Sequence, residues 1–476
     1  MRSQPARRFY MRYGFGSHSR SRAFSALAAI GLLCRPMMCS AQMVGPTPQP
    51  PGIPVTPEQA EEVQPETWAI HGQGTFTWLL QPAFRSPYQG PQSLSPPANG
   101  RETVDVTLYG GFRPWFGAEI WINPEVDQGF GLSNLVGVAG YVSGDANKAG
   151  KAEPYFLVQR GFLRQTINLG GETEKLKSGL NQLGGAQSAN RVVLTIGKFS
   201  IVDIFDTNTY AHDPRNDFFN WSIIDQGAFD YAANAWGYTY GGAVEWYLDW
   251  WTARTGVFDL SQSPNSRALS RGFAQGQFVA ELEERHSLWD QPGKLKLLYW
   301  LTRGNLGTYL DAISFGEATG TTPSTGSVRG FRTKDGFGLN FEQQLATDLG
   351  AFARASVSQG TVEEVDFTDI NQSISGGLSL TGSRWGRPDD TVGLAGAVNR
   401  ISHQGKLYLA AGGLGGIIGD GQLPNAGPEQ ILEAYYRIAV FDFARVAFDY
   451  QFINHPAYNR DRGPVSIFGL QLHLQF

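Results

Sequence analysis

The chain closes on the stretch FGLQLHLQF, residues 468–476. Apolar and polar residues alternate there without a break, and successive side chains of a β-strand point to opposite faces. The two Phe and three Leu therefore share one face, whereas Gly469, Gln471, His473 and Gln475 share the other. This pattern predicts a strand with one apolar and one polar face.

The same period of two recurs along the chain from Trp68 onward. Most of these segments are close to the 9–11 residues that a tilted membrane strand needs. The abundance of Gly, at 59 residues, and of aromatic residues, at 13%, fits a chain of strands and turns. We predict about sixteen strands, at 68–80, 103–112, 115–123, 155–169, 190–199, 236–248, 250–259, 275–284, 294–303, 336–346, 350–358, 373–382, 391–399, 429–439, 443–453 and 465–476.

The predicted connections alternate between tight turns and long loops. Tight turns follow Phe112, Leu248 and Phe441, and long loops separate most of the other strands. Short periplasmic turns and long extracellular loops are typical of outer-membrane barrels, and an even strand number places both barrel ends in the periplasm. The segment 170–189 is the exception, because it is long on the side where the turns should be short.

The two faces of the predicted strands indicate a membrane barrel. The apolar faces carry Trp, Tyr and Phe near strand ends and Leu, Val or Ile in the middle, as in an apolar band flanked by aromatic girdles. The other faces carry many Glu, Arg, Gln and Thr and are expected to line water. Sixteen strands leave an aqueous channel. We therefore predict an all-β fold, a transmembrane antiparallel β-barrel over 67–476, with a soluble β-sandwich or solenoid as the alternative.

The composition excludes other classes. Charged residues make up only 17% of the chain and the formal net charge is −5, so a nucleic-acid partner is not expected. No apolar run reaches the roughly 20 residues of a membrane-spanning helix. No cofactor motif and no metal-ligand cluster is visible in the sequence, and we expect neither a cofactor nor a metal.

The N-terminal region predicts export. Residues 1–41 are rich in Arg, contain the apolar run 23–34 and read as a signal peptide, with a mitochondrial transit peptide as the alternative. Cys34 and Cys39 both fall inside it, so the mature chain is expected to lack disulfides. The Pro-rich stretch 42–66 is interpreted as a periplasmic linker, or as a docking segment.

Short motifs recur along the chain from Gly117 to Pro464. They are GAEIWINPE at 117–125, QGFGLSN at 128–134, RGFLRQTI at 160–167, GGE at 170–172, GKF at 197–199, FD at 205–206, DPR at 213–215, NW at 220–221, GYTY at 237–240, DYQF at 449–452 and NRDRGP at 459–464. These motifs resemble those of the OprB-type carbohydrate-selective porins. The resemblance covers roughly 67–476, and it implies a sixteen-stranded barrel of the outer membrane that passes sugars such as glucose by diffusion through a binding constriction.

Periodicity predicts which side chains line the channel. If Ile120 and Ile122 face lipid, the alternate residues of that strand, such as Trp121, point into the channel. If Leu157 and Leu163 face lipid, Arg160 and Arg164 point into the channel as well. A lumen charge can contact a solute, or it can simply keep the channel wet and brace the wall. The predicted lumen residues are Glu119, Trp121, Asn123, Arg160, Arg164, Arg254, Glu433 and Arg437. Of these, Glu119, Arg160 and Arg164 are predicted to lie close to the narrowest point.

The loop 200–235 is the best candidate for a constriction. A sugar has flat CH faces and a ring of hydroxyls, so a selective channel needs aromatic faces and polar hydrogen-bonding groups. The loop contains both, including Asp206, Asp213, Arg215 and Trp221. Its aromatic residues would be buried if it folded into the barrel. The alternative is an extracellular lid that packs on itself.

The sequence bears on four possible functions. Passive sugar-selective diffusion is the prediction, and a general or other small-solute porin is its main alternative. An outer-membrane hydrolase would need a Ser–His pair on the lipid face, and no predicted apolar face carries one. A plugged, energised transporter would need a larger barrel. Expected partners are small neutral sugars, outer-membrane lipid and, through the terminal Phe476, barrel-assembly machinery; the sequence leaves the oligomeric state open.

Overall fold

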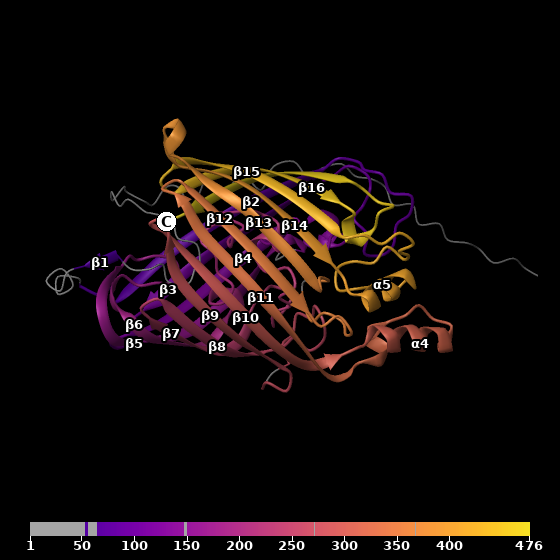
Figure 1. The fold of residues 1–476 in the computed structure, drawn as a ribbon, viewed down its shortest axis with the longest axis horizontal. Helices are drawn as coiled ribbons and strands as arrows, with labels where there is room; N and C mark the ends of the chain where they lie inside the picture. The colour runs from indigo at the N-terminus through magenta and orange to yellow at the C-terminus, as the bar shows by residue number, and fades with distance from the viewer. Residues whose placement is uncertain (1–52, 56–63, 147–149, 271, 367) are drawn as a thin grey trace, which may run out of the picture. The chain divides into compact units, whose positions relative to one another are not determined.

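The structure is a computed structural model that describes residues 53–55, 64–146, 150–270, 272–366 and 368–476 (Figure 1). The predicted signal peptide and most of the predicted Pro-rich linker lie outside the described residues. No helix in the described part of the chain is long and apolar enough to cross a membrane.

Sixteen strands close into one antiparallel barrel. Each strand from β2 to β17 pairs with the next along the chain, and β17 pairs back with β2. The additional short strand β1 pairs with β5. The strands are β1 Ile53–Val55, β2 Trp68–Gln81, β3 Asn99–Phe112, β4 Ala118–Gly129, β5 Lys151–Leu176, β6 Gly185–Phe199, β7 Thr239–Leu248, β8 Trp251–Asp259, β9 Gly276–Leu288, β10 Gln291–Leu306, β11 Gly330–Ala346, β12 Leu349–Ser358, β13 Gln372–Gly382, β14 Arg387–Arg400, β15 Glu429–Phe441, β16 Ala444–Asn454 and β17 Val465–Gln475. The sixteen predicted segments correspond one to one with β2–β17.

The helices of the described residues all lie in connections between strands. The longest two, α4 and α5, sit together at one end of the barrel (Figure 1). The helices are η1 Leu132–Leu135, η3 Ile201–Asp203, α3 Trp221–Ile224, α4 Tyr309–Thr319, η4 Thr325–Val328, η5 Ser383–Trp385, α5 His403–Ala410 and η6 Pro456–Tyr458.

The connections differ at the two ends of the barrel. At the end that we name the long-loop end, they are 82–98, 130–150, 200–238, 260–275, 307–329, 359–371, 401–428 and 455–464. At the opposite, short-turn end they are 113–117, 177–184, 249–250, 289–290, 347–348, 383–386 and 442–443. The connection 177–184 is the longest at its end, but it is shorter than the predicted connection 170–189, because β5 continues to Leu176 and β6 begins at Gly185.

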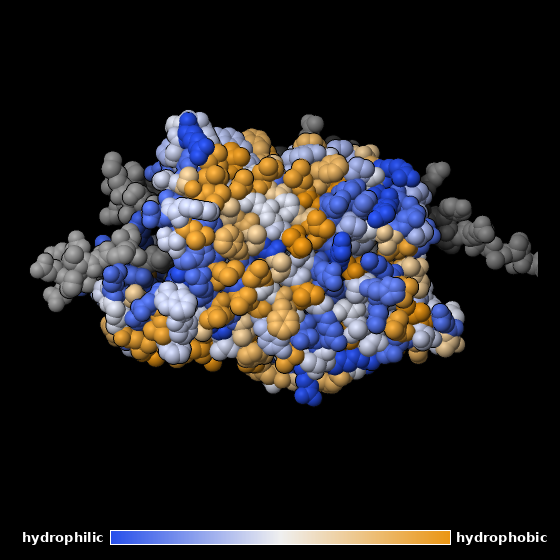
Figure 2. Space-filling view, viewed as in Figure 1, coloured by the Kyte–Doolittle hydropathy of each residue, from blue (hydrophilic) through white to orange (hydrophobic). Residues whose placement is uncertain are grey.

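The outer wall is apolar. Alternate strand residues such as Ile122, Ile374 and Leu297 are at least half exposed on it, whereas their neighbours are buried inside. Large aromatic residues mark the short-turn end of this band, as expected where membrane strands reach a lipid–water interface. They include Trp68, Phe112, Phe116, Trp250, Trp289 and Phe441. Figure 2 shows hydrophobic residues gathered over the strands, with hydrophilic ones toward the end that carries α4 and α5.

One predicted side-chain direction is wrong because β5 contains a bulge. Asn123 pairs with Arg160, but the next residue of β4 pairs with Val158, so Gln159 is an extra residue in β5. A bulge of one residue exchanges the two faces of a strand. Val158 is therefore exposed on the outer wall, and Leu157, which was predicted to face lipid, points inward.

Candidate functional site

The long connection 200–238, between β6 and β7, folds into the barrel. Its aromatic side chains Phe205, Phe218, Phe219 and Phe229 are at most 1% exposed and belong to one apolar core with the inner faces of the strands. Burying these rings removes their apolar area from water, which stabilises the inward conformation. The contacts of the loop are with the wall of the barrel, as the constriction hypothesis requires, and not only within the loop.

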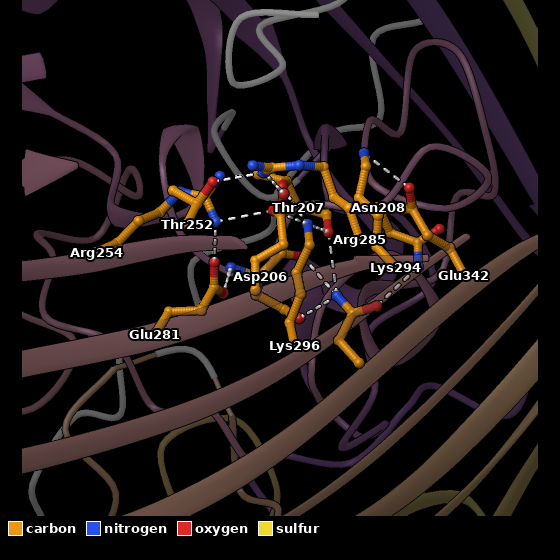
Figure 3. Close-up of polar contacts among 12 residues, drawn as sticks. Asp206, Thr207, Asn208, Thr252, Arg254, Glu281, Arg285, Lys294, Lys296 and Glu342 are labelled. Atoms are coloured by element: carbon orange, nitrogen blue, oxygen red, sulfur yellow. Dashed lines mark hydrogen bonds and ion pairs between the residues drawn. The ribbon is translucent and has the colours of Figure 1, made fainter. Parts of the chain in front are cut away.

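The first part of the loop is fixed to β9–β12 through Asp206 (Figure 3). The backbone N–H of Asp206 donates to Glu281 at 2.7 Å. The Asp206 carboxylate accepts from Asn340 Nδ2 at 2.7 Å and from Arg354 Nε at 3.3 Å. The next residue, Thr207, accepts hydrogen bonds from the Lys296 ammonium group. A buried carboxylate needs such partners, because its desolvation is costly without them.

Arg254 lies just beside this anchor and braces the wall. Its guanidinium contacts Glu245 at 3.2 Å, Glu281 at 2.8 Å and Glu283 at 2.9 Å. Figure 3 shows Arg254 and Glu281 next to Asp206. Because Arg254 is 4% exposed and engaged by three carboxylates, its position fits the bracing role that the sequence left open.

The middle of the loop is fixed to a second part of the wall, formed by β15 and β16. Glu433 on β15 accepts from the backbone N–H groups of Phe219 and Asn220. The side chain of Asn220 donates to Gln451 on β16 at 3.1 Å. Arg437 on β15 donates to the carbonyl of Asp217 at 3.1 Å. The loop therefore crosses the lumen from β9–β12 to β15–β16 and narrows it.

A second loop, described over 130–146, supports the first. The backbone carbonyl of Tyr141 accepts a hydrogen bond from the backbone N–H of Trp221 at 3.0 Å, and the centres of the two rings lie 5.2 Å apart. The backbone N–H groups of Ala139 and Gly140 donate to Glu429 on β15. Sequence reasoning did not assign this loop to the lumen, because its small residues carry no periodic signal.

A cavity of about 80 Å³ lies between the loop and the wall near β5. This volume is far below the roughly 300–1,000 Å³ of typical small-ligand pockets, so this part of the lumen is narrow. Aromatic and charged side chains meet in its lining. The lining includes Arg160, Asp203, His212, Asp213, Arg215, Trp221, Asp225, Tyr231, Trp236 and Tyr238.

Arg160 joins the wall to the loop at this cavity. Its guanidinium donates to both oxygens of Asp203, Nη2 to Oδ1 at 2.6 Å and Nε to Oδ2 at 2.7 Å. The same guanidinium lies 5.0 Å from the centre of the Tyr238 ring. Tyr238 falls inside the predicted strand 236–248, but β7 begins at Thr239, and Tyr238 is buried inside the barrel.

The other side of the cavity is a charged network. Arg215 contacts Asp105 at 3.1 Å and Asp145 at 2.7 Å. Burial alone would raise the pKa of Asp213, but the nearby Arg215 holds it below its ordinary value. His212 Nδ1 lies 3.7 Å from Asp225. Burial lowers the pKa of His212, but Asp225 outweighs it, so the pKa ends above its ordinary value.

The predicted site residues fall into three groups. Arg160, Asp213, Arg215 and Trp221 line the cavity. Asp206, Glu433, Arg437 and Arg254 hold the loop or brace the wall. The third group lies elsewhere on the inner wall and does not line this cavity: Glu119, Trp121, Asn123 and Arg164.

The third group lies on β4 and β5, where Glu119 pairs with Arg164 near the short-turn end of β4 and Asn123 pairs with Arg160. Trp121 Nε1 donates to Glu119 at 2.9 Å, and the Trp121 ring lies over Gly111. A Cβ at Gly111 would lie 2.4 Å from that ring, so only glycine leaves room for it. Glu119 also lies 3.6 Å from Arg164. The prediction that Glu119 and Arg164 share one narrow point with Arg160 therefore does not describe this cavity.

Sequence reasoning missed His212, Trp236 and Tyr238 as site residues. The available signal was the high aromatic content of the loop, which indicates burial but not which rings meet. Among the residues that the structure describes, no group of three or more His, Cys, Asp or Glu side chains could hold a metal ion.

One family model matches most of the chain, and several solved structures are similar to it. OprB, the carbohydrate-selective porin family, matches residues 92–476. No curated protein matches the chain. A high-pH structure of OprB from Pseudomonas putida matches with a TM-score of 0.65 and 15% identity, over 86% of this chain and 94% of that chain. The channel DcaP of Acinetobacter baumannii matches with a TM-score of 0.47 and 10% identity, over 86% and 97% of the chains.

The structural match shows the fold, and the family match spans most of the chain. The chain belongs to the OprB family of carbohydrate-selective porins, β-barrel channels of the bacterial outer membrane.

Proposed function

We propose that this porin passes small neutral sugars of the glucose type, and that the cavity beside the loop 200–238 selects them. The observation that carries the proposal is the meeting of aromatic rings and ionised side chains in one narrow part of the lumen. Aromatic faces stack on the CH faces of a sugar, and charged groups form strong hydrogen bonds with hydroxyls.

The transport is proposed to be passive. Binding must be weak enough for release, or flux through a channel stops. Because the cavity is only about 80 Å³, a sugar ring has to displace side chains of the loop to pass. Trp236 is partly exposed at the cavity, whereas the other aromatic lining residues, Trp221, Tyr231 and Tyr238, are buried.

The proposed orientation of the barrel in the membrane follows from the lengths of its connections. We propose that the short-turn end faces the periplasm and the long-loop end the outside, as in other outer-membrane barrels. Residues 1–41 would direct export, 42–66 would form a periplasmic linker, and the exposed Phe476 would serve barrel-assembly machinery. A channel function with no enzymatic activity accords with this arrangement.

Liposome swelling tests the proposal against a general small-solute porin. Purified protein is reconstituted, and swelling rates are compared for glucose, a sugar alcohol and a neutral amino acid of similar size. A selective channel admits glucose fastest, and glucose flux saturates as its concentration rises. Equal rates for solutes of equal size would instead favour the general porin.

A further inference from the structure

The connection 177–184, between β5 and β6, is unlike the other turns at the short-turn end. Those turns have two to five residues, whereas this one has eight. The strand before it, β5, is also long, with 26 residues. Its pairing with β6 continues to the edge of the turn, where Leu176 pairs with Gly185. A turn of this length can extend inward from the rim of the barrel.

The turn folds inward. Leu183 is fully buried and Leu180 is 7% exposed, and both belong to the apolar core that contains Trp121. Gly179 and Gln182 exchange backbone hydrogen bonds of 3.0 and 3.1 Å, which fixes the shape of the turn. Surface turns rarely bury leucines, so this conformation depends on its contacts with the wall.

Glu66, which precedes the first barrel strand in the sequence, is hydrogen-bonded to the turn. The backbone N–H of Glu66 donates to the Gly184 carbonyl at 3.0 Å, and the Gly184 N–H donates to Glu66 Oε2 at 2.8 Å. Arg113 adds a bond of 2.8 Å to the Glu66 carbonyl. The same hairpin also carries β1, which pairs with Thr173–Lys175 of β5.

The inner wall holds the turn from the other side. Arg164 Nη1 donates to the Asn181 carbonyl at 2.7 Å, and His71 Nε2 lies 3.1 Å from Ser178 Oγ. Arg164 is four residues from Arg160 on the same strand, which corresponds to roughly 13 Å. One arginine of β5 therefore holds the long loop, and the other holds the turn.

We propose that the turn 177–184 forms a second constriction, at the short-turn mouth, which limits solutes by size, and that Glu66, Arg113 and Arg164 keep it in place. A sugar that has passed the first narrow part then meets a second one. A monosaccharide encounters the two in succession, whereas a longer saccharide occupies both at once. The second constriction should therefore discriminate most strongly by chain length.

The test replaces the turn with a two-residue hairpin. Deleting 178–183 together with Lys177→Asn leaves an Asn-Gly turn, which suits a tight hairpin. We expect single-channel ion conductance to rise about twofold or more and trisaccharide swelling rates to rise more than glucose rates. Unchanged conductance would overturn the proposal. Ion conductance does not depend on sugar selectivity, so this result is separate from any failure of the proposed function.

Two point variants test the role of the Glu66 hydrogen bonds while the turn stays intact. Glu66→Ala should raise conductance, whereas Glu172→Ala, at an exposed position on the same hairpin, should leave it unchanged. Equal conductance in both variants would overturn the role of Glu66.

A disulfide variant covers the case in which the shortened turn does not fold. A Cβ at Gly184 would lie 3.1 Å from Glu66 Cδ, so the two positions face each other. Glu66→Cys with Gly184→Cys should conduct like the native protein when oxidised and more when reduced. No other cysteine occurs in 64–476. If oxidation left conductance as high as reduction, the turn would not constrict the mouth.

Discussion

Arg160 on β5 and Asp203 at the start of the loop 200–238 form a two-point ion pair, with N–O distances of 2.6 and 2.7 Å. The planar guanidinium matches a carboxylate in this geometry, and lysine cannot reproduce it. The pair fixes the loop to the wall where the cavity opens. Arg160 therefore acts on solutes largely through the position of the loop.

Arg160→Ala should loosen this end of the loop. Because Asp203 loses its charged partner in a mostly buried place, we expect channel current to become noisier and the apparent affinity for glucose to fall about tenfold or more. Current block by glucose in planar bilayers measures both effects. Arg384→Ala, which removes an exposed pair with Asp348, is the matched control and should change neither.

Trp236→Leu tests the aromatic contact directly. Removing a stacking partner worth about 0.5–1.5 kcal/mol should weaken glucose block two- to tenfold, with little effect on ion conductance. Trp250→Leu changes the same residue type on the outer wall, where Trp250 is 61% exposed, and serves as control. The same glucose affinity in all three proteins would mean that Trp236 does not contact the sugar.

Asp206→Ala should release the first part of the loop. Asp206 joins Asn340 and Arg354 to the loop, and breaking a buried charge pair typically costs about 3–5 kcal/mol. Hydrogen exchange of residues 204–212 should accelerate, whereas Asp442→Ala in an exposed turn should have no effect. Native protection in the Asp206 variant would show that other contacts suffice.

The loop should respond to pH through His212. The pKa of this buried imidazole lies above its ordinary value of 6.5 because Asp225 favours the charged form. Stability from the pair is therefore fully present below pH 6.5 and is lost as the pH rises through the higher folded-state pKa. Conductance should increase toward alkaline pH, and His212→Gln should flatten that dependence. A parallel response in both proteins would assign it to another group.

The fold could be predicted from the sequence because alternation is local. In β17, the alternation over residues 468–475 indicates directly which side chains face lipid and which face the lumen. The predicted directions fail where one residue changes the period, as Gln159 does in β5, or where a strand begins later than its pattern, as at Tyr238.

The candidate site could be predicted only in part. The aromatic content of 200–235 indicated burial, and Arg160 followed from strand periodicity. However, the distribution of contacts depends on long-range packing. Asp203 and Tyr238 meet Arg160 through loop geometry, and Arg164 turns out to hold 177–184, which no spacing in the sequence specifies.

The central claim, that the cavity beside the loop 200–238 binds glucose-type sugars during passage, is tested most directly by single-channel current titrated with glucose and longer saccharides. The account predicts a saturable decrease of current with glucose, and weaker saturation in the Trp236→Leu protein. A current that falls only in proportion to solution viscosity, equally for sugars and other neutral solutes, would contradict it.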